Sequence, residues 1–131
     1  MELNSIDPFK VEASQELDGV IHRELFRESS ADACPNYSSR RQNGLLVAER
    51  IEDNYGIAVK LGRLRVKQHK MYFARAGRDK ETATEILAVS LSLAICRLAI
   101  LLLQRANASD NAPSRRGDSS PPPSIPFRGW D

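Results

Sequence analysis

The chain has 131 residues, of which 41% are hydrophobic and 27% are charged, and its formal net charge is +2. This length accommodates one domain of common size, and the small net charge excludes a protein that binds nucleic acid through its overall charge. Three short cationic clusters, Arg40-Arg41, Lys60–Lys70 and Arg115-Arg116, are interpreted as solvated surface.

Residues 1–13 form an N-terminal arm that lacks the basic segment and apolar run of a secretory signal. The first helix is predicted over Ser14–Arg27, with Ser14 as its N-cap. Apolar residues repeat there at the spacing of one helical face, at Leu17, Val20, Ile21 and Leu25.

A polar loop containing Pro35 leads into a second predicted helix, which starts after Ser38 or Ser39 and includes Gly44 in its first turns. Its apolar face is predicted to contain Leu46 or Val47, followed by Ile51 and Tyr55. Gly56 suits the left-handed position that commonly ends a helix.

After Gly56 the hydrophobic pattern changes to a period of two, which predicts two or three antiparallel strands between Ile57 and Ala76. Gly62 interrupts this alternation, so we expect a bulge or a turn there.

The longest apolar run is Ile86–Leu103, interrupted by two serines and by Arg97 near its middle. Either a core helix or a membrane span would fit this run, and the cost of a central arginine in a bilayer favours the core helix. Ser90, Arg97 and Gln104 recur every seven residues, so they form one polar stripe, which we expect near water.

The start of this last helix has two interpretations. Thr82–Glu85 matches a capping box, which places the start before the apolar run. Alternatively, the helix begins near Ser90–Ser92 and the residues from Thr84 to Val89 are an extended approach to it.

Together these elements predict an α+β fold, arranged as a small two-layer or α/β/α sandwich, with a short antiparallel sheet and a long C-terminal core helix. The single domain is predicted over residues 14–106. Residues 107–131 are predicted to be a disordered tail rich in Pro, Ser and Arg. Within this tail, Phe127 and Trp130 are candidates for docking to a partner protein.

No catalytic motif is found around His22 or His69, and Cys34 and Cys96 lack metal-binding spacing. No glycine-rich phosphate loop occurs either. The sequence therefore predicts a non-enzymatic protein without a metal or cofactor, and its two distant cysteines favour a reducing cytoplasm.

Four segments resemble a family of small phage proteins, the phage ABA sandwich domain, over about Glu16–Leu103. These segments are ELDGVIHRELF, PNYSS, LLVAERIE and LAICRLAILLL. Pro35, Tyr37 and Ser38 fall on the family's PxYS motif, and Leu93–Arg97 falls on its LAICR motif. The chain departs from the family where Arg27-Glu28 replaces a Gly-Trp pair, where Ser39 or Arg40 replaces an aspartate after PxYS, and where Ser92 replaces a proline.

The resemblance implies a phage or prophage protein. Some similar proteins act as anti-defence sponges, which sequester cyclic ADP-ribose signals and so withhold them from Thoeris effectors, and a homo-oligomer is implied with them. If this function carries over, arginine side chains would bind the phosphates and an aromatic ring would stack on the adenine. The candidate phosphate ligands are Arg97, Arg63, Arg65 and Arg75, and the candidate stacking residues are Tyr72 and Phe73.

Three of these candidates also have a structural interpretation. Arg97 could pair with a buried acid or extend to the surface, and Tyr72 and Phe73 could belong to the sheet core. Three functions therefore stay open at this point: a nucleotide-sequestering domain, a protein-interaction adaptor that uses the tail, and a single-pass membrane protein.

Overall fold

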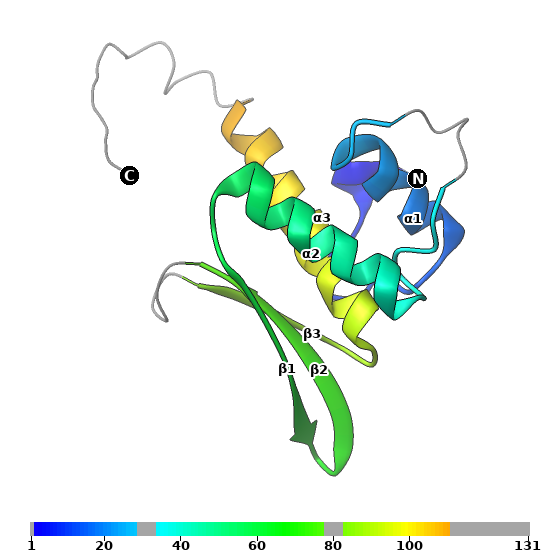
Figure 1. The fold of residues 1–131 in the computed structure, drawn as a ribbon, viewed down its shortest axis with the longest axis vertical. Helices are drawn as coiled ribbons and strands as arrows, with labels where there is room; N and C mark the ends of the chain where they lie inside the picture. Colours follow the sequence, from blue (N-terminus) through cyan, green and yellow to red (C-terminus); the bar gives the residue numbers. More distant parts are fainter. Residues whose placement is uncertain (1, 29–33, 78–82, 111–131) are drawn as a thin grey trace.

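A computed structural model describes residues 2–28, 34–77 and 83–110 (Figure 1). The predicted α+β fold is confirmed, with two helices, a three-stranded antiparallel sheet and a long last helix following one another along the chain. The elements are a 3-10 helix η1 (Leu3–Ser5), α1 (Gln15–Glu24), α2 (Arg41–Tyr55), β1 (Val59–Val66), β2 (His69–Ala76), β3 (Thr84–Ala88) and α3 (Leu91–Asp110).

The start of α1 and the end of α2 follow the predicted signals, whereas α1 ends at Glu24, three residues before the predicted Arg27. The Ser14 side chain accepts a hydrogen bond from the Leu17 amide and caps α1. Gly56 ends α2 in the left-handed conformation, with φ 64°. Of the two alternatives for the apolar face of α2, Val47 is fully buried, whereas Leu46 is 47% exposed.

The sheet has the order β1-β2-β3, and β1 pairs with β2 residue for residue. The bulge or turn predicted at Gly62 is therefore wrong. Gly62 lies opposite Phe73, and a Cβ atom at this position would overlap the Phe73 ring, so the close approach of the ring explains the glycine. The turn between the strands is Lys67-Gln68, whose positive φ angles suit a tight hairpin.

The capping-box prediction for α3 is wrong, because Thr84–Ala88 forms β3 and pairs with β2. The alternative, an extended approach followed by a helix start near Ser90, is confirmed. The Ser90 hydroxyl accepts a hydrogen bond from the Leu93 amide at 3.2 Å. Ile86 and Ala88 are buried while Glu85 is exposed, which is the alternating burial of a strand with one covered face.

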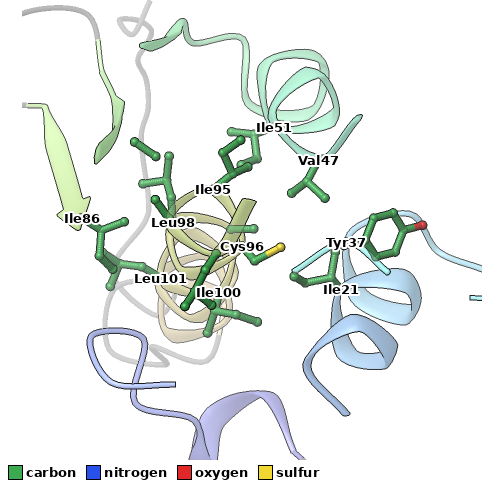
Figure 2. Close-up of a cluster of buried hydrophobic side chains, with 14 of the residues drawn as sticks. Ile21, Tyr37, Val47, Ile51, Ile86, Ile95, Cys96, Leu98, Ile100 and Leu101 are labelled. Carbon is green, nitrogen blue, oxygen red and sulfur yellow. The ribbon is translucent and has the colours of Figure 1, made fainter. Parts of the chain in front are cut away.

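Helix α3 is the centre of the hydrophobic core. Figure 2 shows Ile86 of β3 on one side of α3, Ile21 of α1 on the other, and Val47 and Ile51 of α2 beside it. The helices cover one face of the sheet, as in the predicted two-layer arrangement (Figure 1).

By length and composition alone, one helix in the described part of the chain could cross a membrane. Its window, Leu91–Ala108, has a mean hydropathy of 1.4, and 56% of it is buried inside the protein. In this fold, the apolar side chains of α3 therefore pack against the sheet and the neighbouring helices, as those of a core helix do.

The polar stripe of α3 is partly exposed, as expected, whereas the helix residues around Arg97 are buried. Two of its members, Arg97 and Gln104, also contact the N-terminal arm. The Gln104 amide donates to the carbonyl oxygens of Leu3 at 2.8 Å and Ile6 at 2.7 Å. Arg97 Nε donates to the Val11 carbonyl at 2.8 Å. Because Leu3 and Ile6 are also buried, the arm completes the core.

A buried polar cluster joins α1, the loop before α2, and α3. Ser38, which is fully buried, donates to Asp18 Oδ1 from its backbone amide at 2.7 Å and from its hydroxyl at 2.6 Å. The Ser92 hydroxyl in turn donates to the Ser38 carbonyl at 3.1 Å. One serine of the PNYSS segment thus connects two helices that are distant in sequence.

Tyr37, the neighbour of Ser38, is only 3% exposed. Its hydroxyl lies 2.8 Å from His22 Nδ1, and its ring stacks on Phe26 with 4.9 Å between the ring centroids. Burial, reinforced by the nearby acidic groups Cys34, Glu28, Asp18 and Cys96, raises the pKa of Tyr37 to about 12.

We therefore expect the stability of the fold to fall between pH 10 and pH 12. In this range the phenol of the unfolded chain ionises while folded Tyr37 keeps its proton, so deprotonation favours unfolding, and roughly 2 kcal/mol is lost by pH 12. Urea unfolding at pH 9 to 12 measures this loss in the wild type and in Tyr37→Phe. The difference between the two proteins isolates Tyr37, and equal pH slopes would contradict the assignment.

Candidate ligand-binding groove

Helix α2 begins with positive charge where a helix usually carries acid or a capping side chain. Arg40 occupies the N-cap position without a side-chain capping hydrogen bond, Arg41 follows it, and the first turn has no acidic residue. Two arginines at this position are unfavourable, because they add positive charge to the positive end of the helix dipole and cannot accept hydrogen bonds from the first amides of the helix. A bound anion would accept these hydrogen bonds and balance the positive charge.

The first turn of α3 lies directly beside that of α2. A Cβ atom at Gly44 of α2 would come within 2.7 Å of the Ser92 Cβ atom in α3, so the two backbones nearly touch. Figure 1 shows that both helices start at the same end of the molecule, near the end of β3. Two positive helix ends therefore face the same region of the surface.

A groove opens at this point between the helix starts and the covered face of the sheet, with a volume of about 470 Å³. Tyr72 and Arg63 are opposite each other in the β1–β2 ladder and both line the groove. A second depression of about 250 Å³ shares Arg41, Tyr72 and Leu91 with it. We call this site the basic groove and define it by Arg41, Leu45, Leu61, Arg63, Tyr72 and Leu91.

The arginines of the basic groove have no anionic partner within the described ranges. The two ion pairs among the described residues join Arg23 to Glu24 and Arg75 to Glu85, and neither lies in the groove. Two guanidinium groups therefore lie beside an aromatic side chain without an ion pair to any described residue. Guanidinium groups bind phosphate and carboxylate in a bidentate manner.

The structure brings together only some of the residues predicted for nucleotide binding. Arg63 and Tyr72 share the basic groove. Arg65 is exposed and lies closer to the hairpin turn, opposite Lys70.

Phe73 and Arg75 lie on the opposite face of the sheet, since neighbouring residues of a strand point to opposite sides. The guanidinium of Arg75 lies 5.1 Å from the Phe73 ring centroid and pairs with Glu85 at 3.0 Å. These two residues stabilise the outer face and do not reach the groove.

Arg97 is used inside the fold. Besides its bond to Val11, it donates from Nη1 to the Leu87 carbonyl at 2.9 Å and so ties the N-terminal arm to β3. Arg97 therefore has a structural role, but its partners are backbone carbonyl groups and not the buried acid that the structural interpretation named. The tail candidates Phe127 and Trp130 lie outside the described residues.

Sequence reasoning missed Arg41, Leu45 and Leu91 as groove residues. A signal for Arg41 was present, because a helix predicted to start after Ser38 or Ser39 would carry Arg40-Arg41 in its first turn, without an acid. Leu45 and Leu91 could not be found, because only the packing of α2 against α3 brings them to one surface.

The cysteines are both free, and burial raises the pKa of Cys34 and raises that of Cys96 well above its usual value. Neither thiol is activated as a nucleophile. Among residues 2–28, 34–77 and 83–110, no group of three or more His, Cys, Asp or Glu is arranged to hold a metal ion.

The chain is thus a small α+β domain, with helices on one face of a three-stranded sheet and an open basic groove at the helix starts. No protein-family model, curated protein or solved structure matches it. The similarity to the phage ABA sandwich domain therefore stays a prediction that rests on the motifs quoted above.

Proposed function

We propose that this protein is a non-enzymatic binding domain of phage or prophage origin that sequesters a phosphorylated nucleotide in the basic groove. The observation that carries the proposal is a pair of arginines, Arg41 and Arg63, that have no anionic partner among the described residues and lie beside Tyr72 at the start of α2, where no side chain caps the helix.

The composition of the groove supports a nucleotide over a simple anion. The guanidinium groups and the α2 amides suit phosphate, while Leu45, Leu61 and Tyr72 provide apolar and aromatic surface for a base. The volume of about 470 Å³ falls within the usual range for small-molecule pockets. In this assignment Arg63 and Tyr72 keep the predicted roles, and Arg41 takes the role first given to Arg97.

Binding without chemistry is proposed because the residues that define the groove provide no carboxylate, imidazole or thiol. General acid–base and nucleophilic catalysis most often use such groups, and the one hydroxyl among the residues that define the groove belongs to Tyr72, whose ring is assigned here to stacking on the base. A bound ligand would therefore leave the site in the form in which it entered.

The test is isothermal titration calorimetry with cyclic ADP-ribose, ADP-ribose, AMP and inorganic phosphate. We expect at least one adenine nucleotide to bind more tightly than inorganic phosphate. Arg41→Ala and Arg63→Ala should each weaken that nucleotide roughly tenfold or more, as the loss of a charged hydrogen bond implies. Chromatography of the ligand recovered after denaturation should return it unchanged.

Arg23→Ala is the matched control, because Arg23 is an exposed arginine on α1 that pairs with Glu24. It should bind the nucleotide like the wild type. The proposal fails if no adenine nucleotide binds, or if Arg23→Ala weakens binding as much as the groove variants do.

A further inference from the structure

The β1–β2 hairpin extends past the helices at the lower end of Figure 1. Every residue from Arg65 to Lys70 is exposed, so neither the helices nor β3 cover this end. The tight Lys67-Gln68 turn and the continuous pairing beneath it make the hairpin a defined two-stranded ribbon.

This ribbon concentrates the positive charge of the protein. No acidic residue occurs between Ile57 and Gly77, and this stretch holds six of the cationic side chains: Lys60, Arg63, Arg65, Lys67, Lys70 and Arg75. Since the whole chain has a net charge of only +2, the rest of it is net negative. The low overall charge therefore conceals a strongly basic ribbon.

Two of these cations lie close enough to repel each other. Arg65 and Lys70 are directly opposite in the antiparallel ladder, a pairing that destabilises a sheet when both residues carry the same charge. In the described residues the ribbon has one ion pair, between Arg75 and Glu85 at its far end. The exposed end of the ribbon is therefore electrostatically complementary to a polyanion.

The spacing of these cations suits a nucleic-acid backbone. Arg63 and Arg65 lie on one face of β1, and residues two apart on a strand are separated by about 6.7 Å. Every second phosphate of one B-DNA strand is separated along the helix axis by about the same distance, because the axial rise is 3.4 Å per phosphate. A two-stranded ribbon also fits the width of the B-DNA major groove, about 12 Å.

We propose that the exposed end of the hairpin binds the phosphate backbone of a nucleic acid through Arg63, Arg65, Lys67 and Lys70. This surface is distinct from the proposed nucleotide site. The overall charge of the chain gave no sign of nucleic-acid binding, because the positive charge is local to the hairpin. Only Arg63 is shared with the basic groove.

Fluorescence anisotropy with labelled 20-mer duplex DNA, single-stranded DNA and duplex RNA tests the proposal and distinguishes the nucleic acids. For a duplex, four phosphate contacts give a slope of about −4 for log K against log salt concentration. The double variant Arg65→Ala/Lys70→Ala should weaken binding at least tenfold and make this slope shallower by about 2.

The control variant is Lys10→Ala/Arg23→Ala, which changes the net charge equally at two exposed positions off the sheet. It should keep the wild-type slope. Urea unfolding should show that Arg65→Ala/Lys70→Ala is as stable as the wild type, because it removes a repulsive pair.

The two proposals can fail independently, because Arg65 and Lys70 do not line the groove. Arg65→Ala/Lys70→Ala should therefore bind mononucleotides like the wild type. The nucleic-acid proposal is overturned if no oligonucleotide binds, or if the two double variants bind the oligonucleotide equally well. It is also overturned if vesicles of anionic lipid bind while oligonucleotides do not.

Discussion

Replacing Gly44 with alanine is expected to destabilise the fold by roughly 2 kcal/mol, although alanine is the better helix former. The new methyl carbon would lie 2.7 Å from Ser92 Cβ and 2.8 Å from Ser92 Cα. Because a backbone atom of α3 is in the way, a change of rotamer cannot relieve the overlap, and the two helices must move apart. Urea denaturation with a circular dichroism signal measures the change.

Gly19 provides the matched control, because it is the glycine within α1 and a Cβ atom there would meet nothing within 4 Å. Gly19→Ala should stabilise the protein by roughly 0.5–1 kcal/mol, since alanine loses less conformational freedom in a helix. The two substitutions are thus expected to have opposite signs. A stabilising Gly44→Ala would show that α2 and α3 are not in close contact.

Asp18→Ala is expected to cost roughly 3 kcal/mol, because it removes the acceptor of two hydrogen bonds made by a charged group. The amide and hydroxyl of Ser38 would both lose their bonds to Asp18 in a site from which water is excluded. Since Ser38 also connects to Ser92 of α3, the loop between α1 and α2 would lose its position. The loss is measured as the free energy of unfolding in urea.

Asp18→Asn separates charge from geometry, because the amide oxygen can still accept a hydrogen bond. We expect this variant to lose less than half as much stability as Asp18→Ala. Glu16→Ala, which removes an exposed acid two residues before Asp18 in α1, serves as the control and should change stability by less than 0.5 kcal/mol. Equal losses for Asp18→Ala and Glu16→Ala would contradict the role of the cluster.

Most of the fold could be predicted from local patterns. The apolar spacing of α1, the glycine that ends α2 and the alternation of β1 and β2 all report on neighbours in sequence. The start of α3 was ambiguous because Thr82–Glu85 satisfies a local capping rule. The β2 edge decides against it, since Thr84–Ala88 gains a ladder of backbone hydrogen bonds there.

The candidate site was less accessible to sequence reasoning. Arg63 and Tyr72 could be nominated as an arginine and an aromatic residue, but their common location depends on the strand register. Arg97 was nominated because it is a charge in an apolar run, a pattern that does not distinguish a ligand-binding residue from a structural one. Those partners, the carbonyl groups of Val11 and Leu87, are backbone atoms that leave no signature in sequence.

The contact between the N-terminal arm and α3 determines when the chain can fold during synthesis. The bonds from Gln104 to Leu3 and Ile6 span 101 and 98 residues. A ribosome therefore releases the arm, α1, α2 and the sheet before the helix that covers their apolar surfaces has emerged. The nascent chain has no assembled core until α3 has emerged, so it depends on protection from aggregation up to that point.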